Sequence, residues 1–500
     1  MNLVNSMMVV YACYNRAVRR WPFVVVAVAA APAHADRTSW HVLANGEAAA
    51  TDNVFAAPTG TTREGDVFLT LRPGFLFAWD APRMQHDLSL EVELIEYAFH
   101  SDQPSSSLKG GYRAFFLPGP RSEAVLQLNG QNGLLSAITS RSSPDEAVVQ
   151  VQPINRVDVV QGDGSAYASY QATREIRLSE TVFGRYSRSD DNALDPMDSS
   201  MDDPTIIRSA EAGAVLGFER SFRKDSLSLE AGASWVRLER HASRFIDAST
   251  DPLLELQKSR LDRQIVPRTR IQWRHDFNKR WSGSADGGLA FVYPYGTDPY
   301  NPMATDRKSG VFPIAGANLA YIEPWGRMQL QVRRDITPNL FVAQNTVNDL
   351  AVAQLAMPLT WLDDSAMRRP KFVLLATAGG ARTQLIDTLS GKQNSSFLVG
   401  RADVGINYNA SPGITYGVRY ELLAQTGNDT AEQVVPGFFR NTLFFTFAIR
   451  YPDRVAAEVP QRRAQNAVRA DRKDLVPIGV EPVVPDPLEQ GDEGEESGEQ

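Results

Sequence analysis

The feature that most constrains this chain is an alternation of apolar and polar residues with a period of two. In residues 441–451, Leu443, Phe445 and Ile449 fall on one face of an extended strand, and Thr442 and Thr446 fall on the other. Period two is the signature of a β-strand with one face in an apolar environment. Beyond residue 36 the alternation recurs along the chain, with almost no helical periodicity and no apolar run long enough for a membrane helix. The sequence therefore predicts an all-β protein.

The connections between these segments distinguish a membrane barrel from a soluble β-sandwich, which could show the same alternation. Tight turns, for example near 80–83, 118–120, 363–370 and 411–413, alternate with longer polar loops such as 189–205, 241–259 and 336–346. Short turns at one end, long loops at the other and both chain ends on the short-turn side are typical of outer-membrane barrels. Such a sheet must also close, because hydrocarbon offers no partner for the N–H and C=O groups of a free edge.

Counting the alternating segments from residue 36 to residue 451 gives a transmembrane antiparallel β-barrel of about 18 strands. A count of 16 is the alternative, since 167–188 and 327–348 can be divided differently. Aromatic residues near segment ends, such as Trp79, Trp273 and Tyr451, fit girdles at the two membrane interfaces. We therefore expect a barrel in the cell outer membrane.

The amino-terminal 35 residues predict a cleaved signal peptide. Arg16, Arg19 and Arg20 precede the apolar run 21–31, and the small-x-small pattern of 33–35 follows it. The mature chain is thus expected to begin near residue 36. The single cysteine of the sequence, Cys13, would be removed, which excludes disulfide frameworks and cysteine-ligated zinc from the mature protein.

The carboxy-terminal residues 452–500 depart from the alternation. They are rich in Pro, Arg, Glu and Gln and finish in an acidic run from 486 to 500, a composition typical of disorder. With both ends of the barrel on the short-turn side, this tail is expected in the periplasm. It would either touch a periplasmic partner or remain a solvated tail.

The sequence holds no pattern typical of an enzyme, a metal protein or a nucleic-acid-binding protein. The net charge is −8 without a basic domain, which argues against nucleic acid. The histidines after residue 36 are scattered, with no HExxH spacing, so no metal site is predicted. The glycine-rich stretch 162–165 is interpreted as part of a long loop, 140–164, and lacks the strand-to-helix context of a nucleophile elbow. We expect no catalytic residue and no cofactor.

The face of each strand that points into the barrel carries the candidate site. Charged side chains there need water, and they mark a filled channel or a plug. Arginine suits anionic solutes, while mixed Arg, Glu and Gln walls suit sugars. The alternative is that these charges pair across the lumen and only stabilise the wall. The predicted pore-lining residues are Arg268, Arg270, Gln272, Arg274, Gln329, Gln331, Arg333, Arg401, Arg419, Glu91 and Glu93.

Two stretches near the start of the barrel carry a family resemblance. Residues 50–55, ATDNVF, and 65–75, GDVFLTLRPGF, resemble the first hairpin of a family of proteobacterial outer-membrane β-barrel porins encoded with exopolysaccharide or capsule genes. The resemblance is clearest over residues 40–140. It implies polysaccharide passage across the outer membrane and supplies no catalytic residue. The long charged tail departs from the usual barrel end, where an aromatic terminal residue is read by the assembly machinery.

The expected function is therefore a channel for passage or export of a polysaccharide or of another polar solute, either anionic or neutral. A general nutrient or diffusion porin is the alternative, as is a non-conducting structural or receptor barrel. The expected partners are outer-membrane lipid and lipopolysaccharide, the barrel-assembly machinery and a periplasmic polysaccharide-export component.

Overall fold

A computed structural model describes residues 37–54, 59, 62–81, 83–100, 105–135, 157–191, 205–241, 259–299, 308–323, 325–339, 344–362, 371–386, 393–411, 413–426 and 437–451. These residues all belong to the unit Asp36–Gln500. The expected signal peptide, 1–35, and the expected tail, 452–500, lie outside the described residues. None of the helices in the described ranges is long and apolar enough to cross a membrane.

Eighteen strands form one sheet, and each strand is antiparallel to the next along the chain. The prediction of 18 strands is confirmed, and the alternative of 16 is wrong. The strands are β1 (Arg37–Thr51), β2 (Asp66–Ala81), β3 (Met84–Tyr97), β4 (Ser105–Gly119), β5 (Ser122–Leu135), β6 (Val157–Gln171), β7 (Ile176–Asp191), β8 (Thr205–Ser221), β9 (Asp225–His241), β10 (Arg260–Asp276), β11 (Trp281–Pro294), β12 (Gly310–Glu323), β13 (Gly326–Asn339), β14 (Gln344–Pro358), β15 (Phe372–Ile386), β16 (Gln393–Ser411), β17 (Ile414–Gln425) and β18 (Phe438–Tyr451).

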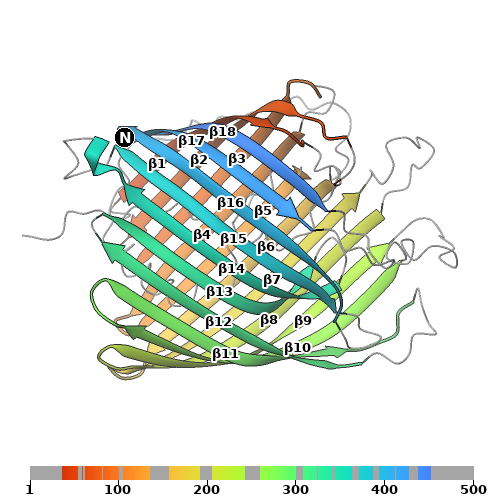
Figure 1. The fold of residues 1–500 in the computed structure, drawn as a ribbon. Helices are drawn as coiled ribbons and strands as arrows, with labels where there is room; N and C mark the ends of the chain where they lie inside the picture. Colours follow the sequence, from red (N-terminus) through yellow and green to blue (C-terminus); the bar gives the residue numbers. More distant parts are fainter. Residues whose placement is uncertain are drawn as a thin grey trace, which may run out of the picture. The chain divides into compact units, whose positions relative to one another are not determined.

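The sheet closes on itself through β1 and β18. Val42 pairs with Tyr451 and Thr51 pairs with Thr442, so the last strand is hydrogen-bonded to the first over most of its length. β1 also pairs with β2, and Figure 1 shows the strands side by side in one tilted wall. Closure leaves no unpaired edge, as a sheet in hydrocarbon requires.

The two rims of the barrel differ as the sequence predicts. One rim, called here the turn rim, carries the start of β1 and the end of β18, because Arg37 pairs with Asp80 and Tyr451 with Val42. Most connections at this rim are short, such as 82–83, 120–121 and 412–413. The opposite loop rim carries the long connections, including 136–156 and 242–259. Since long loops are extracellular in such barrels, the turn rim faces the periplasm.

Three predicted connections are wrong in detail. Residues 162–165 lie inside β6 and not in a loop, because β5 and β7 supply ladder partners on both sides. The expected loop 336–346 shrinks to residues 340–343, since Asn339 pairs with Gln344. The expected tight turn at 363–370 is part of a longer connection, 359–371, which contains the short 3₁₀ helix Thr360–Leu362.

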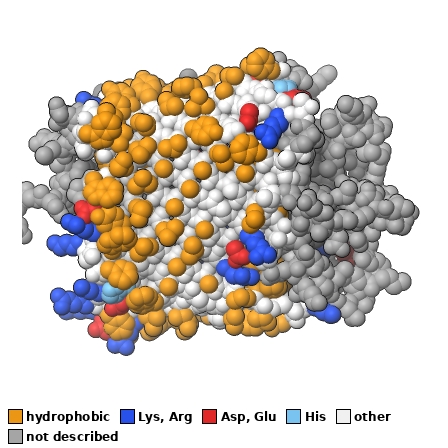
Figure 2. Space-filling model, viewed as in Figure 1, with side chains coloured by type: hydrophobic (Ala, Val, Ile, Leu, Met, Phe, Trp, Pro, Cys, Tyr) orange, Lys and Arg blue, Asp and Glu red, His pale blue; other side chains and the backbone are white. Residues whose placement is uncertain are grey.

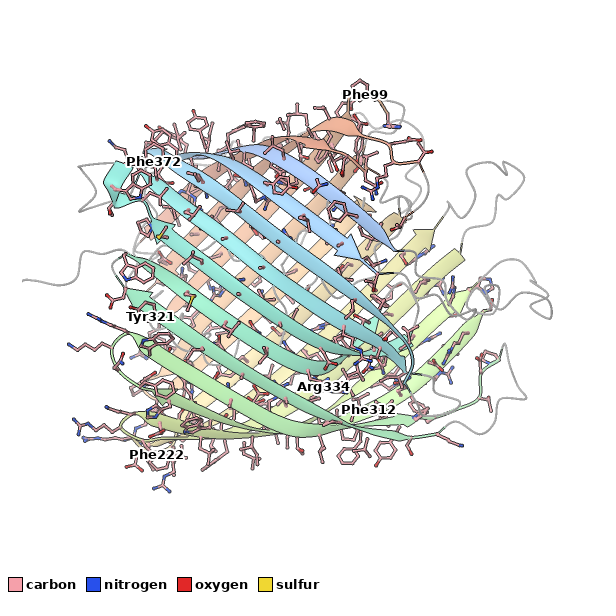
Figure 3. All side chains as sticks on the ribbon, viewed as in Figure 1. Phe99, Phe222, Phe312, Tyr321, Arg334 and Phe372 are labelled. Atoms are coloured by element: carbon pink, nitrogen blue, oxygen red, sulfur yellow. The ribbon has the colours of Figure 1, made fainter. Side chains whose placement is uncertain are left out.

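Buried apolar side chains gather near the loop rim. The largest cluster joins β8 to β15, and two smaller clusters cover β16–β18 and β18–β3. Phe312, labelled in Figure 3, belongs to the largest cluster and is buried. Phe444, which breaks the alternation of the last strand, packs against Phe68 in the third.

Candidate functional site

Contacts between strands that are not neighbours identify the inner face of the barrel. Arg270 of β10 lies 3.7 Å from Asp335 of β13, and Arg268 of β10 lies 3.4 Å from Glu211 of β8. Side chains converge in this way on the concave side of a curved sheet and diverge on the convex side. The face that carries these residues is therefore the lumen face. By the alternation of the strand, Ile271 and Trp273 point outward.

The outer face is apolar and exposed. On β9, Leu227, Leu229 and Trp235 are 47%, 50% and 39% exposed, and the other strands repeat the pattern. Figure 2 shows hydrophobic side chains spread in rows over the face of the wall that is in view. A closed barrel with an exposed apolar outer face and a charged inner face is stable only with lipid outside and water or protein inside. The protein is an outer-membrane β-barrel.

Three ion networks line the lumen. The first lies on β1–β4 and is centred on the buried carboxylate of Glu93. Arg72 Nε donates a hydrogen bond to it, and Lys109 Nζ lies 3.6 Å from the same oxygen. Ser107 Oγ donates to its other oxygen at 3.4 Å, and Arg72 also lies 4.0 Å from Glu47. Two cations thus neutralise a carboxylate that is 2% exposed.

The second network spans β8–β13. Arg270 lies 3.4 Å from Asp286 and 3.7 Å from Asp335, and Arg333 donates a hydrogen bond to Asp335. Arg268 of the same strand pairs with Glu211 of β8. Gly316 makes room for this network, because a Cβ atom at that position would lie 2.4 Å from Asp286 Oδ1.

The third network lies on β16–β18. Arg401 Nη2 donates to Glu421 Oε2 at 2.8 Å, and Arg440 lies 3.9 Å from the other oxygen of Glu421. Asp403 lies 3.8 Å from Arg401. Arg419 stacks over the ring of Phe444 at 4.5 Å, which holds its guanidinium against the wall as a cation–π contact.

Unpaired amides lie between these networks and the turn rim. Gln272, Asn318, Gln329, Gln331 and Gln354 share the lumen face of β10 and β12–β14, and Asn318 pairs in register with Gln331, as Gln329 does with Gln354. Among the described residues, the side chains of the four glutamines have no hydrogen-bond partner, and Asn318 Oδ1 is buried without one. We call these five residues the amide track.

The structure places every predicted pore-lining residue on the lumen face but divides the set by environment. Arg268, Arg270, Arg333 and Arg401 are ion-paired with carboxylates, Glu93 is a network centre, and Arg419 is stacked. Glu91 pairs in register with Lys109, and Arg274 lies 3.9 Å from Asp276 near the turn rim. Gln272, Gln329 and Gln331 remain open to the lumen.

Sequence reasoning missed the partners of these residues. The residues that complete the networks are Glu47, Arg72, Lys109, Glu211, Asp286, Asp335, Asp403, Glu421 and Arg440. Each lies on the lumen face of its own strand, so the alternation alone could have nominated them. The alternation does not give the strand register, and the register decides which carboxylate approaches an arginine two or three strands away.

A histidine joins two connections at the loop rim. His100 Nδ1 lies 2.6 Å from Asp66 Oδ2, and Nε2 lies 3.0 Å from Glu64 Oε2. The hydrogen bond with Asp66, helped by that with Glu64, raises the pKa of His100 above its ordinary value. Both ring nitrogens donate when the imidazole is charged, so the protonated form ties the connection between β1 and β2 to that between β3 and β4.

Comparison with known proteins gives similarity of fold only. No protein-family model and no curated protein matches the sequence. OccK2 (OpdF) of Pseudomonas aeruginosa is similar at 10% sequence identity, over 83% of this chain and 98% of that chain, with a TM-score of 0.41. OccAB3 of Acinetobacter baumannii is similar at 8% identity, over 83% of this chain and 100% of that chain, with a TM-score of 0.41. The FrpB iron transporter of Neisseria meningitidis (F5-1 variant, apoprotein form) is similar at 8% identity, over 82% of this chain and 81% of that chain, with a TM-score of 0.44.

Proposed function

We propose that this barrel is a channel for passive passage of a polar saccharide chain, and that the amide track is where the chain is held. The observation that carries the proposal is the division of the lumen wall. The arginines of the three networks are bound to carboxylates or stacked, whereas the four glutamines of the amide track have no partner among the described residues.

The chemistry of the amide track fits a polyhydroxylated solute. A carboxamide offers two donors and an acceptor with two lone pairs, so one side chain can serve a sugar hydroxyl in either role. A ladder of such groups binds weakly at many sites, as conduction of a chain requires. The paired arginines leave a wall that tolerates anionic sugars without acting as a simple anion filter. The glutamines, and not the arginines, are therefore the residues that we propose to bind the saccharide.

Export of an exopolysaccharide is the biological role that we propose for this passage. The resemblance of residues 50–55 and 65–75 to export-associated porins supports it. In this role the barrel would receive its solute from a periplasmic export component and would be inserted by the barrel-assembly machinery. Transport through it is diffusive and forms no covalent intermediate, so no residue is assigned a catalytic role.

The test is single-channel conductance in a planar bilayer with and without added oligosaccharide. A neutral glucan and an anionic uronate oligomer of equal length are both expected to block open steps. Replacing Gln329 and Gln331 together with Ala is expected to weaken the block by about tenfold or more, since each lost hydrogen bond contributes roughly 1 kcal/mol. Leu330→Ala is the matched control, because Leu330 is on the same strand and points outward.

Each outcome decides between the candidate functions. Block that depends on Gln329 and Gln331 supports a saccharide channel. Open steps that neither oligosaccharide blocks indicate a general nutrient or diffusion porin. Absence of conductance in a folded barrel indicates a receptor or structural barrel and overturns the proposal.

A further inference from the structure

Arginines on the outer face of the barrel have no role in the lumen. Arg208 of β8, Arg237 of β9 and Arg263 of β10 point outward, since they alternate with the lumen-facing Ser209, Val236 and Gln264. We call these three residues the outer arginine row. Arg237 and Arg263 are in direct register on neighbouring strands, and Arg208 faces Glu239 in register.

Among the described side chains, a single carboxylate is ion-paired with any of the three arginines of the row. Arg237 and Arg208 share the carboxylate of Glu239, which lies 3.0 Å from Arg237 and 4.0 Å from Arg208. Arg188 of β7 faces Arg208 in register, as Arg237 faces Arg263. Like charges directly opposite each other on a sheet are destabilising.

The row lies at the border of the apolar band on the loop side. On β9, Arg237 is the next outward residue after Trp235 in the direction of the loop rim, beyond the exposed Leu227 and Leu229. On β10, Arg263 is the next outward residue after Ile265 in the same direction. Trp235 Nε1 donates a hydrogen bond to Tyr295 Oη, and both rings are exposed on the outer face. Tryptophan and tyrosine mark the level of lipid headgroups. Arg237 and Arg263 therefore lie one residue pair beyond Trp235 and level with Tyr295, at the depth of the headgroup phosphates.

A second group repeats this arrangement on another part of the wall. Arg334 of β13, Asp349 of β14 and Arg382 of β15 are in register on three neighbouring strands and point outward. Arg334 lies 3.5 Å from Asp349, yet its Nε is buried without a hydrogen-bond partner, and Arg382 has no ion pair with a described residue. Figure 3 labels Arg334 in the loop-side half of the wall, and Figure 2 shows basic and acidic groups there on an otherwise apolar surface.

We propose that the outer arginine row binds the phosphate groups of lipopolysaccharide in the outer leaflet, and that Arg334 and Arg382 form a second binding site for them. Guanidinium pairs phosphate through two parallel hydrogen bonds and is weakly hydrated, which suits a site at the edge of the hydrocarbon. A phosphate between Arg237 and Arg263 would relieve the repulsion between them. The loop rim is extracellular, so the row faces the leaflet that holds this glycolipid. The inference is independent of what passes through the lumen.

The test measures lipid binding to the folded protein in a neutral maltoside detergent by native mass spectrometry. The ligands are lipid A with both phosphates, the same lipid after dephosphorylation, and inorganic phosphate. Phosphorylated lipid A is expected to bind and the other two are not. Replacing Arg208, Arg237 and Arg263 together with Gln is expected to weaken binding by about tenfold or more. Arg83, Arg174 and Arg223 at the turn rim, replaced together with Gln, are the matched control for lost charge.

Several results would overturn the proposal. These are equal binding of dephosphorylated lipid A, unchanged binding by the Gln variant, and displacement of the lipid by an equimolar amount of inorganic phosphate. Heat-modifiable mobility on gels shows whether each variant is folded. If the Gln variant does not fold, the corresponding Lys variant decides, since it keeps the charge and loses the paired hydrogen bonds. Binding by this Lys variant as tight as by the unaltered protein would also contradict recognition by guanidinium.

Discussion

Removal of the central charge of the third ion network, by Glu421→Gln, should strongly destabilise the barrel. Glu421 accepts a hydrogen bond from Arg401 at 2.8 Å and lies 3.9 Å from Arg440. The three side chains are between 4% and 8% exposed, so solvent screens their interaction little. Loss of one partner of a buried ion pair costs about 3–5 kcal/mol, because the opposite charge stays behind uncompensated.

The remaining carboxylate of this network reduces that cost. Asp403 lies 3.8 Å from Arg401 and continues to neutralise part of its charge. We therefore expect the free energy of unfolding to fall by about 2–3 kcal/mol, which is a change of roughly 30- to 140-fold in the unfolding equilibrium constant.

The assay is urea unfolding of the barrel in lipid vesicles, followed by tryptophan fluorescence and by gel mobility without heating. The matched control is Glu175→Gln, which makes the same substitution in the exposed pair of Glu175 with Arg220, 3.5 Å apart. This control should change stability by less than about 1 kcal/mol. Combining Glu421→Gln with Arg401→Gln should recover part of the loss. Equal effects of the two Glu variants, or simple additivity in the double variant, would refute the reasoning.

Three further predictions follow from the same geometry. Gly316→Ala should destabilise the barrel by about 1–3 kcal/mol through overpacking against Asp286. Gly287→Ala should not destabilise it, because no atom lies within 4 Å of the added Cβ. Comparative urea unfolding of the two variants measures the difference. Reversing Arg268 to Glu or Glu211 to Arg should destabilise the barrel, and the double reversal should restore at least half of the loss, because the pair at 3.4 Å is re-formed; a double-mutant cycle of unfolding free energies checks this. The pKa of His100 is raised in the folded state, so its hydrogen bonds with Asp66 and Glu64 stabilise the loop rim fully below pH 6.5. This stabilisation is lost as the pH rises through the raised pKa. Proteolysis of the loops should accelerate over that pH range, and His100→Gln should abolish the pH dependence.

Much of the fold could be predicted because period two is a local property. Each strand exposes one face to lipid and one to the lumen, so alternation in residues 441–451 or 401–408 already separates the two faces. The errors come where local propensity and closure disagree. Gly162 and Gly164 are poor strand formers and were expected in a loop, but β5 and β7 pair with this segment on both sides. In hydrocarbon an unpaired backbone costs more than glycine loses in a strand.

The candidate site was predictable only in part. The alternation places Arg268, Arg270 and Arg333 on the lumen face, but it cannot show that Glu211, Asp286 and Asp335 neutralise them. Those carboxylates come from β8, β11 and β13, and their approach depends on strand register and on the curvature of the closed wall. The same limit applies to the glutamines, whose lack of partners is a property of their neighbours.

The sequence alone determined that this chain is a barrel of 16 or 18 strands and which residues face lipid, because those features follow from a repeat of two residues and the need to pair every backbone group. The tertiary structure alone decided that there are 18 strands, which charges are neutralised and which amides stay open. These depend on distances between residues far apart in the chain, and closure of the sheet sets those distances.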